Sequence, residues 1–167
     1  MNYSIVIIDM QNIFLKNVLK KDSDIIQKCK RELIKAINDD AQIIFLEFCK
    51  HGPTIQELTS LLKEYKYTKY TFVSKEHDDG SKDLLNVILK NNLPPSIKVC
   101  GVNTDCCVYD TVSGYLHAMT NYKKKSKDSN EFNVKVIIDA CASSWYHEKG
   151  VKYMRDLTDD FKQLSII

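Results

Sequence analysis

An acid, a base and a thiol lie close to the ends of short apolar segments of this 167-residue chain. Asp9 and Lys75 each follow such a segment, and Cys107 lies in the turn 102–107 after another. A cysteine in the first turn of a helix meets unpaired N–H groups and the positive end of the helix dipole, which both favour thiolate. A nearby ammonium group would lower the thiol pKa further, and a carboxylate could take the thiol proton and return it to a leaving amine. These three residue types therefore predict a nucleophilic thiol with its own proton carrier.

The turn that carries the thiol could also stabilise negative charge. Two of its backbone N–H groups, for example those of Asn103 and Cys107, could point at the oxygen of a tetrahedral intermediate. Such an oxyanion hole would complete the chemistry needed for acyl transfer.

The elements that must position these residues alternate between strand and helix. β-branched runs predict strands at Ser4–Ile8, Ile43–Phe48, Tyr70–Ser74, Lys98–Gly101, Val134–Ile138 and Gln163–Ile167. Apolar residues three or four positions apart predict helices at Asp24–Asn38, Thr54–Tyr65, Ser81–Asn91, Asp105–Met119 and His147–Asp159. The polar segment Asn121–Asn133 is expected to be a solvated connection. This order predicts a three-layer α/β/α sandwich around a Rossmann-like, mainly parallel sheet of six strands. In such sheets ligands bind beyond the carboxyl ends of the strands, where Asp9, Lys75 and Cys107 would lie.

Composition limits the class of protein. The length predicts a single domain, 1–167, and the net charge of +2 is too small to indicate a nucleic-acid or membrane partner. We expect a cytoplasmic protein, because no segment is apolar enough to span a membrane and an acid interrupts the apolar start. No GxGxxG or GxxxxGK string is present, and we expect no cofactor.

The six cysteines do not form a recognisable framework. They include no CxxC pair, so neither disulfides nor a zinc site is predicted. Cys29, Cys49, Cys100 and Cys141 lie in apolar surroundings and are expected to be small buried hydrophobes.

Three strings resemble the isochorismatase-like cysteine hydrolases, a family that includes nicotinamidases and other small-amide hydrolases. Residues 7–14, IIDMQNIF, are similar to the family's opening motif, with Ile13 in place of the usual acid. Residues 72–75, FVSK, followed by 79–81, DGS, are similar to the segment of its catalytic lysine. Residues 99–111, VCGVNTDCCVYDT, are similar to G-V-x-T-D-x-C-V-x-x-T. In that string the family's nucleophile precedes valine, which selects Cys107 over Cys106.

The resemblance implies a role for each residue. Asp9 would be the proton carrier, Lys75 its charge partner and Cys107 the nucleophile, as the residue types also indicate. It further implies the strand order 3-2-1-4-5-6 and a cis peptide near Val102-Asn103.

The metal ligands of nicotinamidases are not reproduced. That branch holds a divalent metal with an Asp-x-His and further histidines near the second strand, whereas only Glu47 and His51 are available here. We expect no metal, since zinc needs three or four well-placed donors. Candidates for lining the substrate pocket are Phe14, Glu47, His51, Trp145 and Tyr146.

The sequence thus predicts a cysteine-dependent hydrolase that cleaves the C–N bond of a small amide through an acyl-enzyme. We expect a small-molecule substrate and, as in related proteins, a homodimer or larger homo-oligomer. The alternatives are a non-catalytic, degenerate member that acts as a binding protein, and a vinyl-ether hydrolase of the isochorismatase type. A metal-dependent nuclease of the PIN or NYN kind, with Asp9, Asp105 and Asp139 as ligands, is a further alternative.

Overall fold

The protein is described by a computed structural model covering residues 3–126 and 131–167. Its strands are β1 (Ser4–Ile8), β2 (Gln42–Phe48), β3 (Tyr70–Lys75), β4 (Ile97–Val102), β5 (Val134–Ala142) and β6 (Leu164–Ile166). Its helices are α1 (Asn12–Val18), α2 (Ile25–Asn38), α3 (Gln56–Glu64), α4 (Ser81–Lys90), α5 (Tyr109–Ser126) and α6 (His147–Asp160). A single π-helical turn, η1 (Thr104–Val108), connects β4 to α5.

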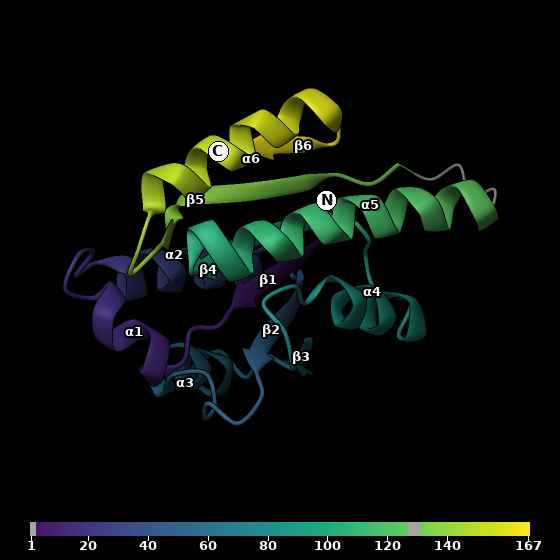
Figure 1. Ribbon diagram of the computed structural model, residues 1–167. Coiled ribbons are helices and arrows are strands. Elements are labelled where there is room, and N and C mark those ends of the chain that lie inside the picture. Colours follow the sequence, from purple (N-terminus) through teal and green to yellow (C-terminus); the bar gives the residue numbers. More distant parts are fainter. Residues whose placement is uncertain (1–2, 127–130) are drawn as a thin grey trace.

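The six strands form one sheet in the order β3-β2-β1-β4-β5-β6, and every neighbouring pair is parallel. This confirms the predicted order and shows that the sheet is wholly parallel. Helices α2 and α3 contact each other on one face, whereas α4 and α5 pack together on the other (Figure 1). The result is the predicted three-layer sandwich.

The central strand β1 is buried along its whole length, with Ile5 to Ile8 at most 1 % exposed. A strand covered by helices on both faces has no polar side, which explains its unbroken apolar run. The chain changes direction at Asp9, where φ is +51°, a left-handed conformation that aspartate adopts more readily than most residues. The acid is thereby placed at the carboxyl end of the most buried strand.

Strand β4 approaches β1 closely because it contains a glycine. Gly101 pairs with Ile8 and has a φ of +128°, and a Cβ atom at this position would lie 2.2 Å from the Ile8 carbonyl oxygen. The register between β4 and β5 also shifts between Val99 and Gly101. The turn that follows β4 is therefore held directly beside the end of β1.

Two local predictions differ from the structure. Helix α1 was not expected, and Gln11, the N-cap residue that precedes it, makes no side-chain capping bond that could have marked its start. Helix α5 continues to Ser126, so the first part of the predicted connection, 121–126, is helical. Its last turn is rich in lysine, which suits the negative end of the helix dipole. The part of that connection at 127–130 lies outside the described residues.

No helix in the described part of the chain is long and apolar enough to cross a bilayer.

Candidate active site

The acid and the base predicted from the sequence meet at the carboxyl edge of the sheet. Lys75 ends β3, two strands from Asp9, and its side chain reaches back so that Nζ lies 2.9 Å from Asp9 Oδ2. The two side chains are 0 % and 1 % exposed, so the ion pair is withdrawn from water. Nζ also donates to the backbone carbonyls of His77 (3.0 Å) and Asp78 (3.3 Å). These contacts fix the ammonium group at one position beside the carboxylate.

Two further features hold Lys75 in place. Its Nζ lies 4.4 Å from the centre of the Phe48 ring, at a distance where a cation is attracted to an aromatic face. Gly80 packs against its aliphatic part, since a Cβ atom there would come within 2.6 Å of Lys75 Cδ. The small-residue turn after β3 thus gives the lysine the space to extend toward Asp9.

The thiol of Cys107 completes the group. It is 3 % exposed, and it is near enough to Asp9 and Lys75 that their charges affect its pKa. Burial and then the negative charge of Asp9 raise the pKa of Cys107, while Lys75 lowers it by less. Burial likewise raises the pKa of Asp9, opposed by the charge of Lys75. The unliganded site therefore favours a neutral thiol, in contrast to the thiolate expected from its position at a helix start.

The π-helical turn η1 presents this cysteine. The peptide bond Val102-Asn103 is cis, as the resemblance implied. The N–H groups of Cys106 (3.2 Å) and Val108 (3.1 Å) both donate to the Asn103 carbonyl oxygen. The Asn103 side chain is held by the N–H (3.0 Å) and hydroxyl (3.2 Å) of Ser144. The turn is therefore tied to the loop before α6 as well as to itself.

Asp78 contacts the thiol and was not among the residues singled out from the sequence. It lies in the exposed loop between β3 and α4, and its Oδ1 accepts a hydrogen bond from Cys107 Sγ at 3.3 Å. Lys75 and Asp78 are three residues apart, so the loop that fixes the ammonium also places a second carboxylate on the sulfur. The sequence signal for it was only an acid close to Lys75.

Phe14 and His51, two of the predicted pocket residues, gather on the β2 side of the site. The ring centre of His51 lies 5.3 Å from that of Phe14 and 5.1 Å from that of Phe48. Because Phe48 also contacts the Lys75 ammonium, these rings form an aromatic wall next to the ion pair. Glu47 has a different contact, since its Oε1 accepts a hydrogen bond from the Thr54 N–H at 2.7 Å.

A buried glutamine supports this wall. Gln11 Nε2 donates to the carbonyl of Phe48 at 3.0 Å and to that of Gly52, and its Oε1 accepts the Phe48 N–H at 2.9 Å. Its role as a brace between the end of β2 and the loop after it was missed, although it belongs to the string at residues 7–14.

Trp145 and Tyr146 lie on another part of the rim. They are 58 % and 66 % exposed, in the loop that Asp105 anchors by accepting hydrogen bonds from the Ser143 hydroxyl and the Tyr146 N–H. Trp145 lines a cavity of about 400 Å³ together with Lys21, Ser143 and His147, and none of its lining residues is Asp9, Lys75 or Cys107. The five predicted pocket residues are thus divided between two regions.

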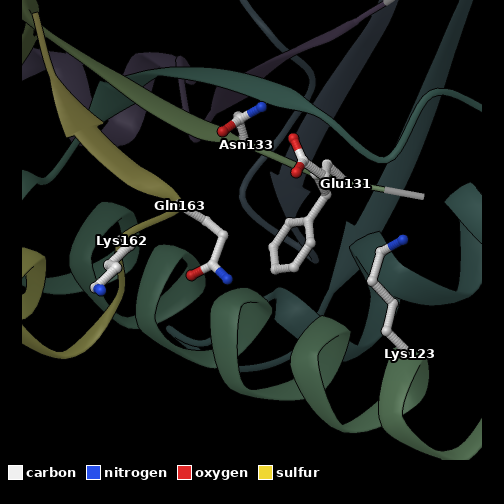
Figure 2. A pocket seen from close by; sticks show the side chains of 6 residues that line it. Lys123, Glu131, Asn133, Lys162 and Gln163 are labelled. Atoms are coloured by element: carbon white, nitrogen blue, oxygen red, sulfur yellow. The ribbon is translucent and has the colours of Figure 1, made fainter. Parts of the chain in front are cut away.

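A further cavity, of about 380 Å³, is remote from this chemistry. Figure 2 shows it between α5, the start of β5 and the residues before β6, lined by Lys123, Glu131 and Gln163 among others. These segments mark the amino ends of β5 and β6, whereas the ion pair lies at the carboxyl ends of β1 and β3.

The residues near β2 do not assemble a metal site. Among residues 3–126 and 131–167, one group of three Cys, His, Asp or Glu donors is close enough to share an ion, and it consists of Asp78, Cys106 and Cys107. Glu47 and His51 do not belong to it. The donors at the position where nicotinamidases hold their metal therefore do not fit one.

Comparisons with known proteins agree with this architecture. The profile of the Isochorismatase domain family matches residues 3–161. The nicotinamidase from Staphylococcus aureus has a similar structure, with 15% identity over 99% of this chain and 97% of its own, and a TM-score of 0.73. The N-carbamoylsarcosine amidase from Thermoplasma acidophilum is 12% identical over 99% of this chain and 95% of its own, with a TM-score of 0.67.

A ribonuclease has the same fold. The MAR1 ribonuclease from Caenorhabditis elegans is 19% identical over 93% of this chain and 73% of its own, with a TM-score of 0.70. No curated protein matches this sequence. At such identities the structural likeness establishes the fold, and the chemistry must be argued from the site.

Proposed function

Because the chain belongs to the isochorismatase domain family, we propose that it is a cysteine hydrolase that cleaves the C–N bond of a small amide. The observation that carries this proposal is the buried Asp9–Lys75 ion pair with the Cys107 thiol beside it. Nucleophile, proton carrier and charge partner are the groups that amide cleavage through an acyl-enzyme requires.

The reaction begins with the neutral thiol. As Cys107 Sγ bonds to the amide carbon, its proton passes to Asp9, whose raised pKa makes it a better acceptor than an ordinary carboxylate. The Lys75 ammonium lies against Oδ2 of Asp9, whereas Oδ1 accepts no hydrogen bond from the described residues and is the oxygen that would take the proton. The Lys75 ammonium stabilises Asp9 before the transfer and the developing charge on sulfur during it.

In the remaining steps of the reaction Asp9 first gives up this proton and then takes another. Asp9 protonates the amide nitrogen, the C–N bond breaks, and ammonia or an amine leaves behind a thioester on Cys107. Water then attacks the thioester carbon while Asp9 takes one of its protons, and the acid product departs as the thiol is restored. Each step thus uses the same carboxylate in alternating roles.

The negative oxygen of the two tetrahedral intermediates needs hydrogen-bond donors. The N–H groups of Cys106 and Val108 are already engaged with the Asn103 carbonyl. We assign the N–H groups of Asn103 and Cys107 to this oxyanion, because both belong to the turn that carries the nucleophile.

The substrate must displace Asp78 from the sulfur. The aromatic wall of Phe14, Phe48 and His51, whose rings meet tilted or edge to face, then offers a largely apolar contact for a small amide beside Lys75. Trp145 and Tyr146 would close the opposite side if their exposed loop moves over the bound substrate. A small molecule rather than a polymer is the expected substrate.

The alternatives are less well supported. The isochorismatase-type vinyl-ether reaction proceeds without a cysteine and leaves Cys107 unused. A PIN- or NYN-like nuclease would require Asp9, Asp105 and Asp139 to converge. Asp139 instead is exposed and pairs with Arg31 at 3.1 Å, while Asp105 binds the loop before α6. A degenerate binding protein would not need the desolvated ion pair, whose burial is costly.

The experiment that tests the proposal is a screen of primary amides, including nicotinamide and carbamoylated compounds, with ammonia release as the readout. RNA is included as a separate substrate because of the ribonuclease of the same fold. Cys107→Ala is expected to lower kcat/KM by more than about 10⁴-fold. Cys49→Ala is the matched control, since this half-buried cysteine is joined to Lys75 by a backbone hydrogen bond that the substitution keeps. A Cys107→Ala protein that turns over as fast as the parent would refute the proposal.

Two properties remain expectations of the same proposal. We expect a homodimer or larger oligomer and a cytoplasmic location, to be measured by light scattering and cell fractionation.

A further inference from the structure

A second thiol faces the proposed site and has no part in the reaction above. Cys106 is half-buried beside Cys107, and both sulfur atoms lie near the exposed carboxylate of Asp78. Their donor atoms are all within 4.8 Å of one another, and Cys107 Sγ is 3.3 Å from Asp78 Oδ1. Two sulfurs and a carboxylate therefore converge from two separate segments, the turn η1 and the loop after β3.

The charge around these donors is unbalanced. Asp78 and Asp79 both lie near enough to Asp110 for the charges to interact, and the charges of Asp78 and Asp110 also affect Cys106. Lys75, the ammonium group that interacts with Asp110, is already paired with Asp9. Several carboxylates thus surround the two thiols, and a divalent cation would relieve their mutual repulsion.

We propose that Asp78, Cys106 and Cys107 bind a zinc-class divalent cation, with water as the fourth ligand. Zinc bonds of about 2.3 Å to sulfur and 2.0–2.2 Å to oxygen place tetrahedral donors roughly 3.5–3.8 Å apart. The observed spacing fits with side-chain shifts of an ångström or less. Thiolates select zinc or cadmium over magnesium or calcium. This site differs from the position of the nicotinamidase metal near Glu47 and His51.

Binding is an exchange of two protons for one ion. The cation forms bonds to both sulfurs and to one Asp78 oxygen, and each thiol releases its proton to the solvent, so the net charge of the site does not change. The lone pair that Cys107 would use for attack becomes a metal bond. The bound ion would therefore inhibit hydrolysis reversibly, a consequence that rests on the proposed function, whereas the binding itself does not.

The experiment titrates the metal-free, reduced protein with Cd²⁺ and follows the ultraviolet thiolate-to-cadmium band. The expected result is one ion and two released protons per chain, with no competition from Mg²⁺. Cys106→Ser and Asp78→Asn are each expected to weaken Cd²⁺ binding at least tenfold. A loss of about tenfold is the smallest usually caused by replacing a residue that supports a metal ligand, and these two residues are ligands themselves. Asp78 is exposed, so its variant should fold normally even if Cys106→Ser does not. Cys49→Ser is the control and should bind Cd²⁺ as the parent does.

Several outcomes would overturn the site. These are the absence of a band in the parent protein, parental affinity in both the Cys106→Ser and Asp78→Asn proteins, or equal loss in Cys49→Ser. A band that persists in both site variants would place the ion on other thiols, such as buried Cys29, Cys100 and Cys141. Zn²⁺ inhibition reversed by a chelator is measured in parallel on any substrate found. If the protein binds Cd²⁺ but its metal-free form hydrolyses no amide, the proposed function alone is refuted. If the metal-free protein is an active amidase but does not bind Cd²⁺, the metal site alone is refuted.

Discussion

Replacing Lys75 by methionine tests whether the buried ion pair has the electrostatic character that the mechanism requires. The substitution keeps an unbranched side chain but removes the charge that lies 2.9 Å from Asp9. Asp9 is then left buried without its counter-ion, at 1 % exposure. Breaking a buried pair on one side usually costs about 3–5 kcal/mol, which is a large part of the stability of a typical domain.

The magnitude depends on pH, because Asp9 can escape the penalty by taking a proton. Its pKa is already above the ordinary 3.8, and the loss of Lys75 raises it further, since the lysine charge is what lowers it. In the unfolded chain the carboxyl keeps its ordinary pKa, so each pH unit above that value adds about 1.4 kcal/mol to the cost of folding with Asp9 protonated. Protonation of Asp9 therefore limits the loss of stability in Lys75→Met to about 4 kcal/mol at pH 7 and about 1.6 kcal/mol at pH 5. The destabilisation is therefore present at neutral pH and is lost as the pH falls.

Urea denaturation of the parent and Lys75→Met proteins at pH 5, 6, 7 and 8 measures this difference. The double variant Asp9→Asn/Lys75→Met removes both charges and should be more stable at pH 7 than Lys75→Met alone. Lys90→Met, at an exposed position at the end of α4, should change the free energy of unfolding by no more than about 0.5 kcal/mol. A loss for Lys75→Met that is below about 1 kcal/mol and constant with pH would refute the account of the ion pair.

Three other predictions follow from the same geometry. Asp9→Asn should abolish turnover yet speed the alkylation of Cys107 by iodoacetamide at pH 8, because the charge of Asp9 raises the pKa of the thiol. Mass spectrometry maps the alkylated cysteine, and slower alkylation of Cys107 would contradict this prediction. In the parent protein kcat/KM should fall on the acid side as Asp9 is protonated, with a midpoint above 3.8, and a flat profile down to pH 4 would remove Asp9 from the proton transfer. Gly101→Ala should lower the free energy of unfolding by more than about 3 kcal/mol, because φ is +128° and a Cβ atom would lie 2.2 Å from the Ile8 carbonyl oxygen. Gly52→Ala, with φ of +82° and no atom within 4 Å of the new Cβ, should lower it by only about 1 kcal/mol, and urea denaturation measures both.

The layered fold could be predicted because strands and helices differ in the period of their apolar residues. All six strands and five of the helices lie where the sequence places them, although α5 starts four residues later and ends seven residues later than predicted. Helix α1 was missed because it is only seven residues long and has no capping side chain. The extension of α5 was missed because its last turn is polar. That polar turn extends a helix whose buried residues, including Tyr115 and Met119, all lie before it in the sequence.

The amino-acid order by itself determined which chemical groups reach the sheet edge, since Asp9, Lys75 and Cys107 each lie at or just after a strand and parallel strands end on one side. It did not determine their protonation, because a pKa depends on burial and on charges from other segments. Only the tertiary structure shows that Lys75 crosses a strand to reach Asp9, that desolvation favours a neutral Cys107, and that Asp78 rests on the sulfur. These contacts join residues from separate segments of the chain, and the packing of β1 against β4 at Gly101 holds the turn of Cys107 beside the strand that ends before Asp9.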